Sequence, residues 1–152
     1  MKRLAPYLGI ALVVAVVLLP KLRGAHVPHT EFDAAMAQAE AENKCLFLAF
    51  TGSDWCDWCV KFESEIYTRP AFKQYAASNL VVMMIDFPRH EGTKTPAQRE
   101  RDSQLANRFG VQGFPTVFVL CPQGKTIAKT GYRDGGSAEY VAHIERLIAD
   151  TR

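Results

Sequence analysis

The sequence has little net charge, no internal repeat and no low-complexity segment. Its 18 Lys and Arg residues nearly balance 16 Asp and Glu residues, so the formal net charge is +2 at pH 7. So small a charge gives no support to nucleic-acid binding, which needs concentrated positive charge. The 152 residues, 48% hydrophobic and 22% charged, are instead typical of a globular chain with one core.

The sequence lacks a second closely spaced pair of cysteines, which argues against a metal site. The chain has four cysteines. A structural zinc ion needs four ligands, usually from two closely spaced pairs. Cys56 and Cys59 form one such pair, but neither Cys45 and Cys121 nor the histidines form a second. We therefore expect no metal, and no dissociable cofactor, in this protein.

A long uncharged apolar stretch lies near the N-terminus. Residues 4–20 carry no charge, and two basic residues lie directly before them and two more soon after. This layout is typical of a secretory signal or of a short uncleaved membrane anchor, although a membrane span usually needs about 20 residues. We assign residues 1–25 to this segment, rather than to a buried first helix, and residues 26–152 to the folded domain.

The choice between cleavage and anchoring depends on the residues after the stretch. Arg23 stands where a cleavage site needs a small residue, so the site that would end at Ala25 is poor. No cysteine directly follows the stretch, so a bacterial lipid anchor on Cys is not encoded. We therefore favour retention as an inner-membrane anchor over cleavage. Either outcome places the domain on the extracytoplasmic side, as in the bacterial periplasm, where disulfides persist.

The rest of the chain alternates between patterns typical of helices and of strands. The expected elements are a helix from Thr30, strands at 45–50, 80–87 and 116–121, a helix after residue 59 that Pro70 breaks, a helix ending near Gly110, a strand after a turn at 122–125, and a helix from Ser137. Continuous apolar runs such as 45–50 are typical of strands buried on both faces. Residues 88–103 are polar and of mixed charge, which predicts an exposed loop that runs into a helix, with a solvated charged face. The order predicts an α/β fold, a mixed sheet with helices on both faces.

The candidate reactive residues are Cys56 and Cys59, which follow the first expected strand and open a helix. Unpaired N–H groups and the helix dipole at such a position favour a thiolate and lower the pKa of the cysteine from about 8.5. Thiolate is the nucleophile in disulfide exchange. We predict that Cys56 attacks and that Cys59, one turn further on, resolves the mixed disulfide. The alternative is a purely structural pair of cysteines.

These features resemble the thioredoxin superfamily, and in particular exported thioredoxin-like proteins with a GSDWCxWC loop. The resemblance covers about residues 30–150 and rests, in order, on the strand LFLAF, the motif WCDWC, the segment GVQGFPT at 110–116, Gly124, Gly131 and the last amphipathic helix. It implies a thioredoxin-like fold with a central mixed sheet. It also implies that Pro115, between Phe114 and Thr116, is cis and packs against the redox pair. There, its loop would present backbone groups to an incoming peptide.

The resemblance further implies that substrate contacts lie around the cysteines, at Trp55, Asp57 and Trp58, as well as at residues 114–116. The sequence departs from classical thioredoxin in two respects. Asp57 and Trp58 replace the Gly-Pro pair between the cysteines, and the strand before them lacks a buried acid that would help to move the resolving thiol's proton. Asp57 opposes a low Cys56 pKa by like-charge repulsion, whereas Trp58 shields the pair or offers an apolar contact to substrates.

The other two cysteines begin and end two of the expected strands. The thioredoxin-like topology implies that Cys45 and Cys121 lie on antiparallel neighbours, at the end of the sheet away from the redox pair. They form either a second disulfide or two buried thiols. We favour the thiols, because a free cysteine packs well as a small apolar residue.

The sequence and the resemblance together predict a protein thiol–disulfide oxidoreductase, with the reductase role favoured. Its substrates would be disulfides or thiols of other exported proteins, and a membrane or soluble redox partner would recharge the pair. One alternative is a binding module that holds a client protein on the same scaffold and whose activity survives the change Cys56→Ser. The other is a peroxide-reducing enzyme, which would need a Thr or Arg beside the reactive cysteine.

Overall fold

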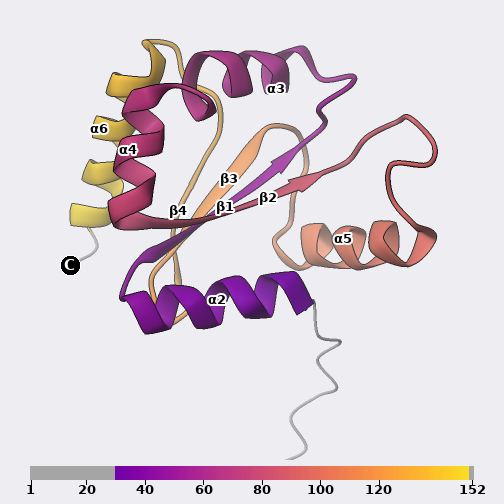
Figure 1. Ribbon diagram of the computed structural model, residues 1–152, viewed down its shortest axis with the longest axis horizontal. Coiled ribbons are helices and arrows are strands. Elements are labelled where there is room, and N and C mark those ends of the chain that lie inside the picture. Colours follow the sequence, from indigo (N-terminus) through magenta and orange to yellow (C-terminus); the bar gives the residue numbers. More distant parts are fainter. Residues whose placement is uncertain (1–29, 151–152) are drawn as a thin grey trace, which may run out of the picture.

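Four strands and six helical segments make up residues 30–150, the part of the chain that the computed structural model describes (Figure 1). The signal or anchor expected at residues 1–25 lies outside these described residues. Among the helices of residues 30–150, none is long and apolar enough to cross a membrane.

The sheet has the order β2-β1-β3-β4, with β1 (Cys45–Thr51) and β3 (Thr116–Leu120) in the centre. β1 runs parallel to β2 (Leu80–Asp86) and antiparallel to β3, which pairs antiparallel with β4 (Thr126–Thr130). Every residue of β1 is buried, as its unbroken apolar run predicts. β2 is less buried than the sequence predicts, because it is an edge strand and its alternate residues are only half-buried.

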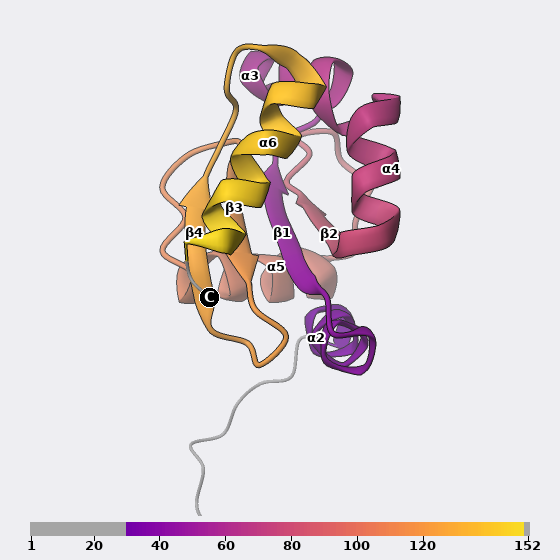
Figure 2. The ribbon, with the colours of Figure 1, turned by 90° about the vertical axis from the view of Figure 1, so that its left-hand side faces the viewer.

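Helices cover both faces of this sheet, as predicted (Figure 2). One face is covered by α2 (Thr30–Glu42) and α5 (Pro96–Arg108), which lie below the strands in Figure 1. The other is covered by α3 (Asp57–Phe62), the π-helical turn η1 (Glu63–Tyr67), α4 (Pro70–Asn79) and α6 (Gly136–Ala149).

The side chains on the two faces of β1 belong to two separate clusters of apolar residues. Leu46, Leu48 and Phe50 pack with α2 and α5. The intervening Cys45, Phe47 and Ala49 pack with the helices on the opposite face. Because successive side chains of a strand point to opposite faces, this one central strand supplies both halves of the core.

The helix after the redox motif is continued and broken as the sequence predicts. α3 passes directly into η1, and Pro70 then begins α4 at its first position, where a missing N–H group has no hydrogen bond to lose. Further on, α5 starts with a capping box between Thr95 and Gln98. Gly110, the expected end of that helix, has a φ of +62°, which glycine adopts without strain.

Candidate active site

Cys56 is positioned by a tight turn between the end of β1 and the start of α3. The Cys56 N–H donates to the Gly52 carbonyl at 3.0 Å, which closes the turn. Gly52 has to be glycine here, because a Cβ atom on it would lie 2.5 Å from the indole Cε2 of Trp55. Cys56 itself has extended φ and ψ angles and is the N-cap of α3. The turn therefore places the Cys56 sulfur at the end of the helix with unpaired N–H groups.

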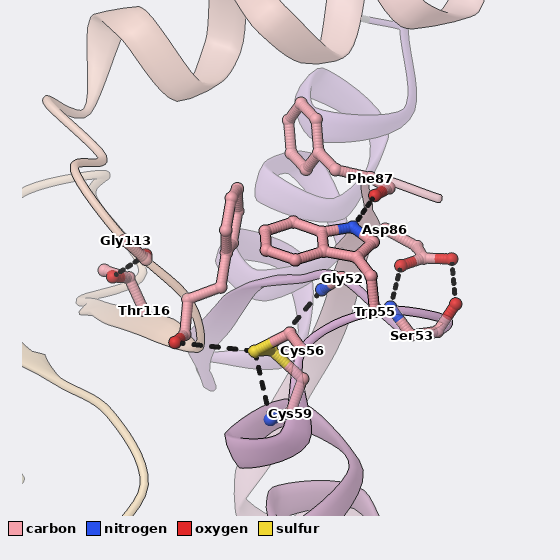
Figure 3. The surroundings of a disulfide bond; sticks show 10 residues. Gly52, Ser53, Trp55, Cys56, Cys59, Asp86, Phe87, Gly113 and Thr116 are labelled. Carbon is pink, nitrogen blue, oxygen red and sulfur yellow. Dashed lines mark hydrogen bonds between the residues drawn. A yellow bond between two sulfur atoms is a disulfide. The ribbon is translucent and has the colours of Figure 1, made fainter. Parts of the chain in front are cut away.

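The two sulfur atoms form a disulfide and are both held by backbone N–H groups (Figure 3). The Cys59 N–H donates to Cys56 Sγ at 3.2 Å, and the Gly52 N–H donates to Cys59 Sγ at 3.4 Å. Cys56 is 8% exposed, whereas Cys59 is 1% exposed. A reagent therefore reaches the sulfur of Cys56 before that of Cys59.

The loop before β3 faces the disulfide. The carbonyl oxygen of Phe114 lies 3.6 Å from Cys56 Sγ, and the Phe114–Pro115 peptide bond is cis, as the resemblance implies. Thr116 donates from its hydroxyl to the Gly113 carbonyl at 2.7 Å, which fixes the loop as it enters the strand. Behind the loop, a Cβ atom at Gly131 would lie 2.8 Å from the Pro115 oxygen, so the chain there packs closely against it.

Trp55 forms one wall of the site. Its indole N–H donates to the Phe87 carbonyl at 2.7 Å, and its ring packs against the Phe114 ring in a T-shaped arrangement at a centroid distance of 5.6 Å. The guanidinium of Arg89 lies 4.4 Å from the centre of the indole, within cation–π range. Trp55 thus joins the end of β2 to the loop that faces Cys56.

Trp58 lies on the outer side of the site and is 55% exposed, with Val60 beside it at 51%. Its ring packs against Tyr132 at a centroid distance of 5.4 Å. The Tyr132 hydroxyl donates to Glu65 at 2.6 Å, and this hydrogen bond raises the pKa of Tyr132. Asp57 is also exposed. The residues between the two cysteines are therefore open to contact with a partner.

Two aspartates anchor the surrounding loops, through partners that no local sequence pattern predicts. Asp86, the last residue of β2, accepts from the N–H and the hydroxyl of Ser53 at 2.8 and 2.6 Å. Asp54, in the turn before Cys56, accepts from the backbone N–H groups of Arg89 and His90, both at 2.9 Å. These hydrogen bonds, that of Arg89 first, hold the pKa of the Asp54 carboxyl well below its usual range.

The charged segment at 88–103 is not entirely the solvated face that the sequence predicts. Asp102 is 6% exposed and forms an ion pair with Lys94. The Lys94 ammonium also donates to the Asp86 carbonyl at 2.6 Å. Lys94 is half-buried and compensates the buried charge of Asp102, which would be costly without a partner, and its bond to Asp86 attaches the loop to the end of β2. The loop therefore belongs to the framework of the site.

The remaining two cysteines lie at the opposite end of the sheet, as predicted. The antiparallel register of β1 and β3 pairs Leu46 with Leu120, so Cys45 and Cys121 come one residue beyond that pair. Both are in the described part of the chain, and the structure gives them as thiols rather than as a disulfide. Cys45 is buried and Cys121 is half-buried, so the expectation of two buried thiols holds fully only for Cys45.

Comparison with known proteins agrees with this geometry. A family model described as a thioredoxin-like domain matches residues 32–146. The chain is similar to the disulfide bond reductase DsbH of Chlamydia pneumoniae, with 31% identity over 127 residues that cover 84% of this chain and 76% of that protein. A solved structure of a DsbH oxidoreductase has a TM-score of 0.73 to it and 31% identity, covering 78% of this chain and 81% of that one.

A further relative is much larger than this chain. The thiol:disulfide interchange protein DsbD of Pectobacterium atrosepticum is 26% identical over 98 residues, which cover 62% of this chain but only 15% of that protein. The family model and the DsbH relative each span most of residues 30–150, including the turn that carries Cys56 and Cys59. The chain therefore belongs to the thioredoxin-like domain family, and it is a protein thiol–disulfide oxidoreductase.

Proposed function

We propose that this protein reduces disulfides in exported proteins, with Cys56 as the nucleophile and Cys59 as the resolving thiol. The Cys56 thiolate attacks one sulfur of a substrate disulfide, and the other substrate sulfur leaves and takes up a proton. Cys59 then attacks Cys56 Sγ in the mixed disulfide and releases the second substrate thiol. The substrate gains two electrons and two protons, and the enzyme is left with a Cys56–Cys59 disulfide.

The observation that carries the choice of Cys56 as the nucleophile is the hydrogen bond from the Cys59 N–H to Cys56 Sγ, at 3.2 Å. In the dithiol form the same N–H group faces the Cys56 sulfur and stabilises negative charge on it. Cys56 is also the more exposed of the two sulfurs, so a substrate disulfide meets it first. Cys59 is buried, so it reacts in the second, intramolecular step.

The reductive direction is supported by the charge beside the nucleophile. A strong oxidant in this class has an unusually stable dithiol form, which makes its disulfide easy to reduce. Here, the exposed carboxylate of Asp57 directly follows Cys56 and disfavours its thiolate by like-charge repulsion. A less stable thiolate makes the dithiol a better electron donor. The name of the similar DsbH protein, disulfide bond reductase, favours the same direction.

Substrate contacts are proposed for the surfaces around Cys56. The loop of Phe114, Pro115 and Thr116 offers its backbone beside the sulfur, since the Phe114 oxygen already lies 3.6 Å from it. Trp58 offers an exposed apolar ring on the other side, and Trp55 supports the loop from behind. An extended substrate segment would run between these surfaces, with its disulfide over Cys56.

Electrons have to return to the protein after each cycle, and we assign this to a membrane or soluble partner that carries a reduced dithiol. We also propose that the domain works on the extracytoplasmic side, with residues 4–20 as a membrane anchor. The charge and hydropathy pattern of residues 1–25 supports this location. A protein kept at the membrane surface would meet a membrane-bound electron donor directly.

Redox titration of the full-length protein tests the proposal. The protein is equilibrated in dithiothreitol or glutathione buffers, and the thiols of Cys56 and Cys59 are trapped by alkylation and identified by peptide mapping. We expect one reversible two-electron transition, with a potential nearer to the value of about −270 mV for thioredoxin than to the value of about −120 mV for a strong oxidant. The reduced protein should also reduce the interchain disulfides of insulin.

A potential near that of the strong oxidant would reverse the proposed direction. Absence of any reversible Cys56–Cys59 disulfide would remove the proposed mechanism altogether. In that case, the Cys56→Ser variant should be tested for binding to a client protein. Binding as tight as that of the wild type would identify the protein as a binding module.

A further inference from the structure

A second pair of cysteines is brought together at the end of the sheet away from Cys56. Cys45 is the first residue of β1, and Cys121 directly follows β3. The antiparallel register joins Leu46 to Leu120, and one further step places Cys45 opposite Cys121. Residues opposite each other in antiparallel strands project to the same face of the sheet.

The backbone at Cys121 favours the closer of the two kinds of cross-strand pair. The Cys121 N–H donates to the Lys125 carbonyl at 2.9 Å, toward β4 and hence away from β1. Opposite residues that do not share ladder hydrogen bonds have Cα atoms about 4.5 Å apart. A disulfide accepts Cα separations of roughly 4.4–6.8 Å. Continued by one residue, this register therefore gives the two cysteines a spacing that a disulfide can close.

Both thiols open onto one cavity. An open cavity of about 840 Å³ is lined by Cys45 and Cys121 and by residues of α4 and α6, including Tyr75, Ser78 and Ile148. Cys45 packs in the apolar cluster on the α4–α6 side of the sheet, and Cys121 lines the same cavity. Cys121 is half-buried, whereas Cys45 is 8% exposed. A small molecule that enters the cavity therefore reaches Cys121 more easily than Cys45.

We propose that Cys45 and Cys121 are a second redox pair, which a low-molecular-weight disulfide oxidises reversibly to an intramolecular disulfide. The Cys121 thiolate attacks the small disulfide, and one small thiol leaves with a proton. Cys45 then attacks Cys121 Sγ in the mixed disulfide and releases the second small thiol. Two protein thiols lose two electrons and two protons, and the small disulfide becomes two small thiols.

This second pair works independently of Cys56 and Cys59. The seven residues of β1 separate the two ends, and a strand rises about 3.3 Å per residue, so the distance is roughly 20 Å. Thiol–disulfide exchange needs direct contact between sulfurs, which excludes internal transfer over this distance. Oxidation of Cys45 and Cys121 would instead link β1 covalently to β3 and close a long chain loop, which stabilises the fold.

The test uses the full-length chain with Cys56→Ser and Cys59→Ser, which leaves Cys45 and Cys121 as the remaining thiols of the four. The protein is equilibrated with mixtures of reduced and oxidised glutathione, quenched in acid and alkylated in denaturant with a mass-tagged maleimide. We expect both tags to be lost together and reversibly. A tryptic peptide pair linked through Cys45 and Cys121 should appear, and the oxidised form should unfold at a higher temperature than the reduced form.

Several results would contradict the second pair. Both thiols could stay open to alkylation at every glutathione ratio, or oxidation could stop at a glutathione adduct or at a disulfide-linked dimer. In the matched control, Cys45→Ala in the same background, Cys121 should stop at the adduct. If the double variant fails to fold by near-ultraviolet circular dichroism, peptide mapping of the oxidised wild-type protein gives the same answer. Failure of the proposed reductase would appear separately, in the insulin assay.

Discussion

A pair of cysteines lies near each end of strand β1, but the two pairs are brought close in different ways. After the strand, Cys56 and Cys59 lie within one turn of α3, and N–H groups point at both sulfurs. At its start, Cys45 lies near Cys121 in the fold only because β1 and β3 pair in a register that joins Leu46 to Leu120. A local turn therefore makes the first pair, whereas the whole sheet makes the second. The first can be tuned by a neighbouring residue, but the second depends on the fold.

The largest expected difference is between two variants that each lack one thiol, one at each end of β1. Cys56→Ser should lower insulin reduction by about 10³-fold or more, because no other sulfur occupies the position of the nucleophile. Cys121→Ser should change the same rate by less than about twofold, because the far end lies roughly 20 Å away. Insulin turbidity with dithiothreitol as donor measures both rates. Equal losses in the two variants would mean that the ends are coupled.

A second substitution breaks the turn of the active-site end alone. Gly52→Ala puts a Cβ atom 2.5 Å from the Trp55 ring, which hydrogen bonding to Phe87 and packing on Phe114 prevent from moving freely. We expect a loss of about 1–3 kcal/mol in the free energy of unfolding, measured by urea denaturation, together with lower reductase activity. Gly113→Ala is the matched control, since nothing lies within 4 Å of the Cβ that it adds. If both variants were equally stable, the turn would not be constrained by Trp55.

A smaller effect, seen only through pH, is expected at Asp54. Its hydrogen bonds from Arg89 and His90 lower its folded pKa, so the ionised carboxylate stabilises the fold above the usual Asp pKa of about 3.9. That stabilisation is lost as pH falls below this value toward the lower folded pKa. Asp54→Asn should therefore have a lower urea midpoint than wild type at pH 7, and the difference should shrink between about pH 5 and pH 2.

Glu91→Gln is the control for Asp54, because it removes a carboxylate from an exposed position in the same loop. Its urea midpoint should follow that of the wild type across the pH range. If the difference in urea midpoint between Asp54→Asn and the wild type stayed constant with pH, the charge of Asp54 would not be what stabilises the loop.

The smallest expected effect is on the reduction potential. Asp57→Asn removes the negative charge next to Cys56, so it should stabilise the thiolate and make the potential more positive. The repulsion between exposed neighbouring charges is on the order of 0.5–1 kcal/mol, which corresponds to roughly 10–20 mV for two electrons. Redox titration measures it, with Glu40→Gln on the distant helix α2 as the control. A more negative potential in Asp57→Asn would contradict the argument for the reductive direction.

Much of the fold follows from local patterns in the sequence. The apolar run of β1, Pro70 at the start of α4 and Gly110 at the end of α5 each act within a few residues, so the pattern alone predicts the element. The reduced burial of β2 could not be predicted in this way, because an edge position is a property of the whole sheet.

The candidate site shows the same division. Cys56 and Cys59 are recognisable because they are close in sequence and follow a strand. The cis bond before Pro115 came from the resemblance rather than from any local pattern. Asp54 was missed as an anchor because its partners, Arg89 and His90, lie 35 and 36 residues away in sequence. The ion pair of Lys94 with the buried Asp102 was missed because a mixed-charge segment is usually solvated.

The position of the tryptophans gives the active-site end an optical signal of its own. The chain has two tryptophans, and Trp55 and Trp58 flank Cys56 on either side. A disulfide quenches the emission of a nearby indole, so reduction of Cys56–Cys59 should brighten the intrinsic fluorescence of the protein. Oxidation of Cys45 and Cys121, at the far end, should leave it nearly unchanged. The redox state of Cys56 and Cys59 can therefore be followed by intrinsic fluorescence without an added label. That of Cys45 and Cys121 has to be followed by mass spectrometry and by thermal stability.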